Sequence, residues 1–188
     1  MYDRFQGLIF DMDGTLLDTE PTHRLAWRQV LGQYGMTYDE NAMVALNGSP
    51  TWRIAQIIIE NNQADMDPHH LAALKTAAVE SMLLDSVKPL PLIDVVLAYK
   101  GKKPMAVGTG SEHRMADALL RHLGLHDCFQ AIVGADDVTR HKPEPDTFLR
   151  CAELIGVAPK DCVVFEDADF GIQAAQRANM AWVDVRKL

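Results

Sequence analysis

The sequence of 188 residues has few cysteines and no apolar run of the roughly eighteen residues that a membrane-spanning helix needs. Its three cysteines are far apart and form no C-x-x-C pair, which argues against a disulfide scaffold and against a structural zinc site. Asp3 and Asp11 interrupt the N-terminal region, where a signal peptide needs an unbroken apolar segment. We therefore expect a cytoplasmic protein with reduced cysteines and no membrane partner.

Positive charge is also scarce, because 18 lysines and arginines face 26 acidic residues and give a net charge of −8. The electrostatic field of such a negative protein repels the phosphate backbone of nucleic acids, so nucleic acid is not an expected partner. An anionic small substrate would have to be held by local cations, a metal or helix N-termini. The apolar share of 48% fits a folded domain, alone or with a modest insertion.

Short runs of consecutive apolar residues predict strands that are buried on both faces, because their side chains do not alternate with polar ones. The predicted strands are Gly7–Phe10, Met105–Gly108, Ala131–Gly134, Cys162–Phe165 and Ala181–Val185. Amphipathic segments between the last four predict helices at Glu112–Leu123, Asp146–Ile155 and Phe170–Ala178. This alternation predicts an α/β fold with a parallel sheet and right-handed crossovers.

The connection between the first two strands is far longer than a single crossover needs. Helical spacing recurs within it, at Thr22–Tyr34, Asp39–Leu46, Thr51–Asn61 and Pro68–Leu84, and a crossover helix is expected to begin near Leu92. We therefore predict a sheet domain of residues 1–17 and 87–188, with a helical module of residues 18–86 inserted after the first strand.

The run Asp11-Met12-Asp13-Gly14-Thr15 stands where the first strand ends. Ligands of open parallel sheets bind beyond the carboxyl ends of the strands. Two carboxylates two residues apart in extended backbone point to one side, so they suit a metal, and one can attack while the other moves protons. A strand followed by an ordinary Asp-Gly turn is the alternative explanation.

Thr109-Gly110-Ser111 follows the second strand and opens a helix, which offers hydroxyls, backbone N–H groups and the positive end of a helix dipole. Ser111 is equally explained as a helix cap. Lys142 lies in a stiff, proline-rich turn, where an exposed surface lysine is the ordinary expectation.

Glu166 and Asp167 end the Cys162 strand. Two acidic side chains in this place offer the hard oxygen ligands that Mg²⁺ prefers, or they cap the following helix.

In their order along the chain, these groups resemble the four motifs of the haloacid dehalogenase superfamily: Asp11 with Asp13, Thr109, Lys142, and Glu166 with Asp167. The helical insertion after the first strand is similar to that of its β-phosphoglucomutase-like group. The resemblance covers essentially the whole chain and implies a Rossmann-like core with an inserted helical cap.

The resemblance further implies a monomeric, Mg²⁺-dependent phosphatase of small sugar phosphates, with fructose 1-phosphate the first candidate. It implies that Asp11 is the nucleophile, that Asp13 is the general acid and base, and that Lys142 offsets the charge of the transferring group. Thr109, with Gly110 and Ser111, would bind the phosphoryl group. The metal would be held by Asp11, the backbone carbonyl of Asp13 and Asp167, with Glu166 close by.

Residues of the cap are expected to select the substrate. His23 matches a histidine that faces the catalytic acid in mutase relatives, although a surface histidine explains it equally well. The arginine that grips a second phosphate in those relatives falls on Thr51, with Arg53 two positions on, and a cap lysine falls on Ala77, beside Lys75. We therefore expect hydrolysis rather than transfer.

Three other functions stay open at this point. A sugar phosphomutase would use the same machinery, and a dehalogenase would not need the second aspartate or the Mg²⁺ site. A receiver-type signalling domain also combines acidic residues, threonine and lysine, but has no place for the helical insertion.

Overall fold

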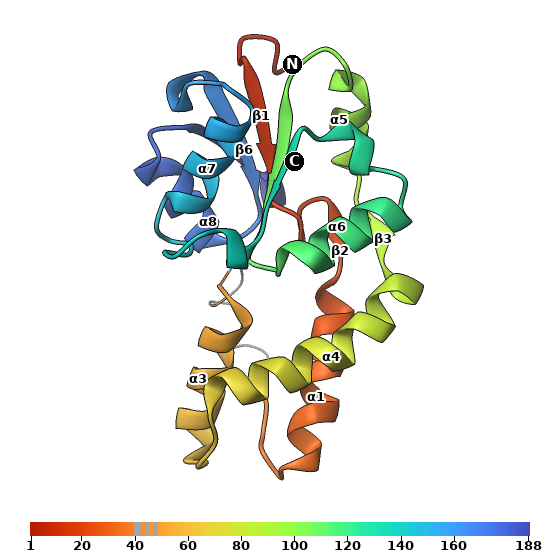
Figure 1. Ribbon diagram of the computed structural model, residues 1–188, viewed down its shortest axis with the longest axis vertical. Helices are drawn as coiled ribbons and strands as arrows, with labels where there is room; N and C mark the ends of the chain where they lie inside the picture. Colours follow the sequence, from red (N-terminus) through yellow and green to blue (C-terminus); the bar gives the residue numbers. More distant parts are fainter. Residues whose placement is uncertain (40–42, 44–45, 47–48) are drawn as a thin grey trace.

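The computed structural model describes residues 1–39, 43, 46 and 49–188, and its centre is a parallel sheet of five strands (Figure 1). The strands are β1 (Gly7–Phe10), β4 (Met105–Gly108), β5 (Ala131–Val133), β6 (Cys162–Glu166) and β7 (Ala181–Asp184). Their order is β5-β4-β1-β6-β7, so β1 lies in the middle with β4 and β6 on its two sides. The predicted strands and their parallel arrangement are confirmed.

Helices cover both faces of the sheet, which explains why its strands are apolar except for Glu166 and Asp184 at the ends of β6 and β7. Leu8 and Phe10 point to the face covered by α5 (Ile93–Tyr99) and α6 (His113–His122). Ile9 points to the opposite face, under α7 (Asp146–Leu154) and α8 (Asp169–Arg177). Short 3-10 helices complete the loops at His126–Cys128, Ala135–Asp137, Pro159–Asp161 and Val185–Lys187.

The inserted segment contains α1 (Glu20–Gln33), α3 (Thr51–Asn62) and α4 (Pro68–Ser86), which pack on one another beyond one end of the sheet (Figure 1). Their shared cluster includes Trp27, Ile58 and Leu71. These helices lie within two residues of their predicted bounds, whereas most of the helix predicted over 39–46 falls outside the described residues. None of the described helices is long and apolar enough to cross a membrane.

A small antiparallel ribbon joins the two groups of elements. It pairs β2 (Leu17–Asp18) with β3 (Lys88–Pro89), and sequence analysis did not predict it, because strands of two residues have no periodicity to detect. We propose that this ribbon marks the boundary between a core of residues 1–17 and 87–188 and a cap of residues 18–86.

The packing is continuous across this boundary. Ala26 of α1, and Val79 and Leu83 of α4, belong to the same buried cluster as Leu8 and Phe10 of the central strand. The middle of α1 and the C-terminal part of α4 are therefore anchored in the core of the sheet.

We expect Leu71→Ala to destabilise the protein by about 2–5 kcal/mol, because Leu71 is fully buried among the cap helices and its loss leaves a cavity. The matched control is Leu97→Ala on α5, where the side chain is 53% exposed and the expected change is within about 0.5 kcal/mol. Urea unfolding of both variants measures the difference. Equal stabilities of the two variants would contradict the expectation.

Candidate active site

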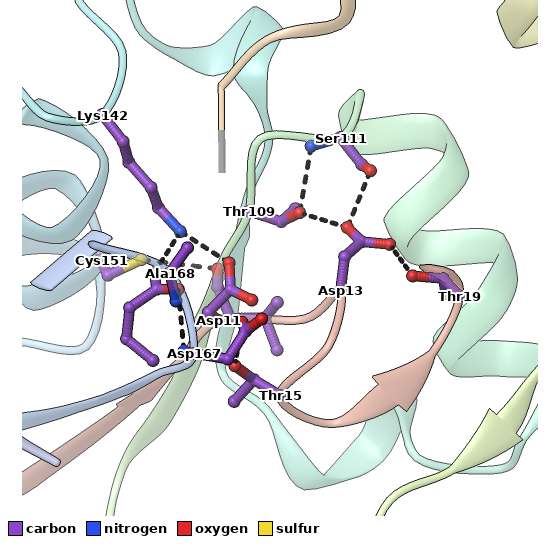
Figure 2. A network of polar contacts seen from close by, with 12 residues as sticks. Asp11, Asp13, Thr15, Thr19, Thr109, Ser111, Lys142, Cys151, Asp167 and Ala168 are labelled. Atoms are coloured by element: carbon purple, nitrogen blue, oxygen red, sulfur yellow. Dashed lines mark hydrogen bonds and ion pairs between the residues drawn. The ribbon is translucent and has the colours of Figure 1, made fainter. Parts of the chain in front are cut away.

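Side chains from three neighbouring strands meet at the carboxyl edge of the sheet (Figure 2). Asp11 follows β1, Thr109 follows β4, and Glu166 and Asp167 lie at the end of β6. The site opens into a cleft of about 720 Å³, including the part that is open to solvent, which core and cap residues line together. The lining residues include Asp11, Asp13, Gly110, Ser111, Glu166 and Asp167 of the core, and His23, Ser49, Thr51 and Lys75 of the cap.

Lys142 is buried at the bottom of this site, with only 1% of its surface exposed. Its ammonium nitrogen lies 2.6 Å from Oδ1 of Asp11 and 2.8 Å from Oε2 of Glu166. The same nitrogen lies 4.7 Å from the ring centre of Phe148, so the aromatic face is its third partner. The interpretation of Lys142 as an exposed surface lysine is therefore wrong.

The charges around Lys142 explain why it stays protonated. Burial alone would lower the pKa of Lys142, but the negative charges of Asp11 and Glu166 outweigh it and hold that pKa above its usual range. A buried ammonium without such partners would be costly. Lys142 is therefore a fixed positive charge beside Asp11.

Acidic groups still outnumber the positive charge at this place. Carboxylate oxygens of Asp11, Glu166 and Asp167 lie within 4.8 Å of one another, against the single ammonium of Lys142. Burial, together with the charge of Asp11, raises the pKa of Asp167 to about 7, and burial and the charge of Glu166 raise that of Asp11. Crowded oxygens whose ionisation is disfavoured fit a divalent cation such as Mg²⁺.

Glu166 is held differently from the other two acids. Its Oε2 accepts from Lys142, and its Oε1 accepts from the backbone N–H groups of Asp167 and Ala168, at 3.0 and 2.9 Å. Both oxygens therefore orient neighbouring groups. The side chain needs the space above Gly171, because a Cβ atom there would overlap its carboxylate.

Asp13 accepts four hydrogen bonds within the cleft, and Figure 2 shows the three that come from hydroxyl groups. The donors are the hydroxyls of Thr19, Thr109 and Ser111, at 2.7, 3.0 and 2.9 Å, and Nε2 of His23, at 3.3 Å. Burial would raise the pKa of Asp13, but these donors outweigh it and hold the pKa below its usual range. Ser111 is thus not a helix cap, since Glu112 takes that position in α6.

Lys75 of α4 fixes the ring of His23. Its Nζ lies 2.7 Å from Nδ1 of His23, and an ammonium only donates, so Nδ1 accepts and the proton sits on Nε2, which faces Asp13. Burial lowers the pKa of Lys75 to about 8. The cap lysine that reaches the cleft is therefore Lys75, two residues before the position expected at Ala77.

The residues after Asp13 support the distant Asp167. Gly14 has a φ of +84°, and a Cβ atom on it would lie 2.5 Å from Oδ2 of Asp167. Thr15 is buried and donates its hydroxyl to Oδ1 of Asp167, at 2.9 Å. Sequence analysis explained Gly14 only by the turn and gave Thr15 no role. Thr15 and Asp167 are 152 positions apart in the sequence, so no local pattern predicts their contact.

Arg53 does not take the place of the arginine that is missing at Thr51. Its guanidinium lies over the ring of Phe170, 6.0 Å from the ring centre, whereas Thr51 lines the cleft. Among the described residues that line the cleft there is no arginine.

Comparison with known proteins gives three consistent matches. A family model for haloacid dehalogenase-like hydrolases matches residues 5–179. The fructose-1-phosphate phosphatase YqaB of Escherichia coli K12 is 70% identical over 188 residues, the whole length of both proteins. The β-phosphoglucomutase of Bacillus subtilis is 32% identical over an alignment that covers 96% of this chain and 83% of that protein.

A solved structure agrees with these matches. The crystal structure of a β-phosphoglucomutase from Clostridium difficile is similar with a TM-score of 0.84 at 28% identity, over 95% of this chain and 83% of that one. The predicted fold class, a Rossmann-like core with inserted helices, is confirmed.

We expect Gly171→Ala to destabilise the protein by about 1–3 kcal/mol, because the added methyl group must displace the carboxylate of Glu166. Gly32→Ala is the matched control: Gly32 lies in α1 with nothing within 4 Å of an added Cβ, so alanine should stabilise by up to about 1 kcal/mol. Chemical unfolding measures both free energies. A Gly171→Ala variant as stable as Gly32→Ala would refute the packing described for Glu166.

Proposed function

The chain belongs to the haloacid dehalogenase-like hydrolases, and we propose that it is a Mg²⁺-dependent phosphatase of small sugar phosphates, with fructose 1-phosphate as its first substrate. The chemistry is supported above all by the buried carboxylate of Asp11, 2.6 Å from the ammonium of Lys142. The substrate is supported by the relative that is identical at 70% of positions and is named a fructose-1-phosphate phosphatase.

The cation would be held by the side chains of Asp11 and Asp167 and by the backbone carbonyl of Asp13. When bound, it neutralises charge on the phosphoryl oxygens. Because both oxygens of Glu166 are already hydrogen-bonded, we assign Glu166 the orientation of Lys142 and of the turn at Asp167 rather than direct metal binding.

The reaction would proceed in two displacements at phosphorus. A carboxylate oxygen of Asp11 attacks the phosphorus atom, the bond to the sugar oxygen breaks, and that oxygen takes a proton from Asp13. Asp13 then takes a proton from a water molecule, whose oxygen attacks the phosphorus of the aspartyl-phosphate. Phosphate leaves and Asp11 is restored, while Lys142 stabilises the negative charge in both steps.

Asp13 must hold a proton before it can donate one, although its hydrogen bonds favour the ionised form. Thr109 and Ser111 now donate to Asp13, and the same hydroxyls stand beside the predicted phosphoryl position. When they turn to a phosphoryl oxygen, Asp13 loses two donors and its pKa rises. Substrate binding would in this way prepare the general acid.

The cleft favours hydrolysis over mutase chemistry. A mutase must hold a bisphosphate intermediate long enough to return its phosphoryl group, and this requires a cationic grip on the second phosphate. Thr51 lines the cleft in place of arginine, and the guanidinium of Arg53 lies over Phe170. Water is therefore the expected acceptor. The monomeric state and the cytoplasmic location stay predictions.

Asp11→Asn should lower phosphate release from fructose 1-phosphate by at least about a thousandfold, since an amide cannot form the aspartyl-phosphate. Asp94→Asn, at an exposed site of α5, is the control and should keep wild-type turnover. The measurement is released phosphate with Mg²⁺ present. With β-glucose 1-phosphate and its bisphosphate, isomerised product in excess of free phosphate would instead favour a mutase.

Mg²⁺ should raise the stability of the wild-type protein by about 2.7 kcal/mol at a hundredfold excess over its Kd, because only the folded chain brings the acidic groups together. Asp167→Asn should lose most of this gain. Asp169→Asn is the control, since that exposed side chain pairs with Arg186 and should keep the gain. Thermal unfolding with and without Mg²⁺ measures it, and an equal gain in all three proteins speaks against the site.

A further inference from the structure

Ser49, which precedes the first residues of α3, has a buried hydroxyl without a hydrogen-bond partner among the described residues. The residue is only 7% exposed. In the described part of the chain, one other buried side-chain atom lacks a hydrogen-bond partner, Oδ2 of Asp146. The other oxygen of that carboxylate accepts a hydrogen bond from Arg140. Buried polar groups in folded proteins are almost always paired, so an unpaired hydroxyl needs an explanation.

Ser49 belongs to the wall of the catalytic cleft. Ser49 lines this cleft on the cap side, together with Thr51 and Ile54 of α3, while Asp11 and Asp13 line it on the core side. Several other polar groups of the cleft are already paired, as the hydrogen bonds of Asp13 with Ser111 and of His23 with Lys75 show. Ser49 is therefore placed to meet a group that enters the cleft from outside.

The chemistry of the cleft wall around Ser49 suits an uncharged hydroxyl as that group. A serine hydroxyl both donates and accepts, which matches an alcohol, and it carries no charge to attract a second anion. Apolar side chains, among them Trp27, Met43 and Ile54, line the same cleft. A polyol with apolar C–H faces and several hydroxyls suits such a wall.

We propose that Ser49 is a specificity-determining residue that hydrogen-bonds a hydroxyl of the sugar while the phosphate lies at Asp11. This inference rests on the proposed function and deepens it, because it assigns one cap group to the leaving part of the substrate. A sugar phosphate satisfies the hydroxyl of Ser49, whereas a phosphate ester without hydroxyls leaves it unpaired. Sites of this kind discriminate against analogues that lack the hydroxyl.

The test compares Ser49→Ala with the wild type on two substrates, fructose 1-phosphate and phenyl phosphate, which has no hydroxyl on its leaving group. We expect the ratio of the two kcat/KM values, sugar over phenyl, to fall about tenfold in the variant, as the loss of one hydrogen bond predicts. Without substrate, the Tm of Ser49→Ala should equal or exceed that of the wild type, because the variant no longer buries an unpaired hydroxyl.

Ser86→Ala is the matched control. The hydroxyl of Ser86 is paired with Thr22 Oγ1 at 2.8 Å and with the carbonyl of Met82 at 2.7 Å, and Ser86 does not line the cleft. This variant should lower the Tm and leave the ratio of the two kcat/KM values unchanged. The two serines are thus expected to respond in opposite ways.

A second measurement uses deoxy analogues of fructose 1-phosphate, each lacking one hydroxyl. The wild type and Ser49→Ala should hydrolyse one of these analogues with equal kcat/KM, which identifies the hydroxyl that Ser49 binds. If the ratio of kcat/KM for fructose 1-phosphate over phenyl phosphate is unchanged in Ser49→Ala, the inference about Ser49 is wrong, but the proposed function still stands. A wild-type protein that hydrolyses phenyl phosphate but no sugar phosphate overturns the proposed function as well, so the two failures are distinguishable.

Discussion

The ammonium of Lys142, buried between Asp11 and Glu166, is the interaction on which the rest of the site depends. It joins the ends of β1 and β6 to the turn before α7. Its positive charge allows the carboxylates of Asp11 and Glu166 to lie close together in a buried place. Each surrounding feature preserves this contact: Phe148 lies against the ammonium, and Gly171 leaves room for Glu166. One buried ammonium therefore offsets part of the negative charge at this place, where three acidic groups meet.

The parallel sheet makes this arrangement possible. Because β4 and β6 flank β1, groups that are far apart in sequence reach one edge without any long loop. The cap adds the second half of the cleft, through His23 and Lys75, whose contact sets the position of the proton that faces Asp13. In the function we propose, core residues would supply the phosphoryl chemistry, while cap residues would meet the part of the substrate that varies.

Much of this could be predicted from the sequence. Apolar runs and helical spacing located the strands and most helices, and the motif at Asp11 located the edge of the sheet where the acidic groups meet, because both signals are local in the chain. The contacts of Thr15 with Asp167, of Thr19 with Asp13 and of Phe148 with Lys142 could not be predicted. The folded structure, and no local pattern of the sequence, brings each pair together. The resemblance put the cap lysine of mutase relatives on Ala77, beside Lys75, and only the packing of α4 shows that Lys75 is the residue that reaches the cleft.

Because α4 is anchored in the core of the sheet near its C-terminus, its N-terminal part is the part that is free to move relative to the sheet. Val79 and Leu83 lie in the cluster of the central strand, so a rigid tilt of the helix would pivot near Val79. At a rise of about 1.5 Å per residue, Lys75 lies about 6 Å from this pivot and Pro68 about 16 Å. A swing that opens the far end widely would move Lys75 less than half as far, so its contact with His23 would be displaced much less than the far end of α4.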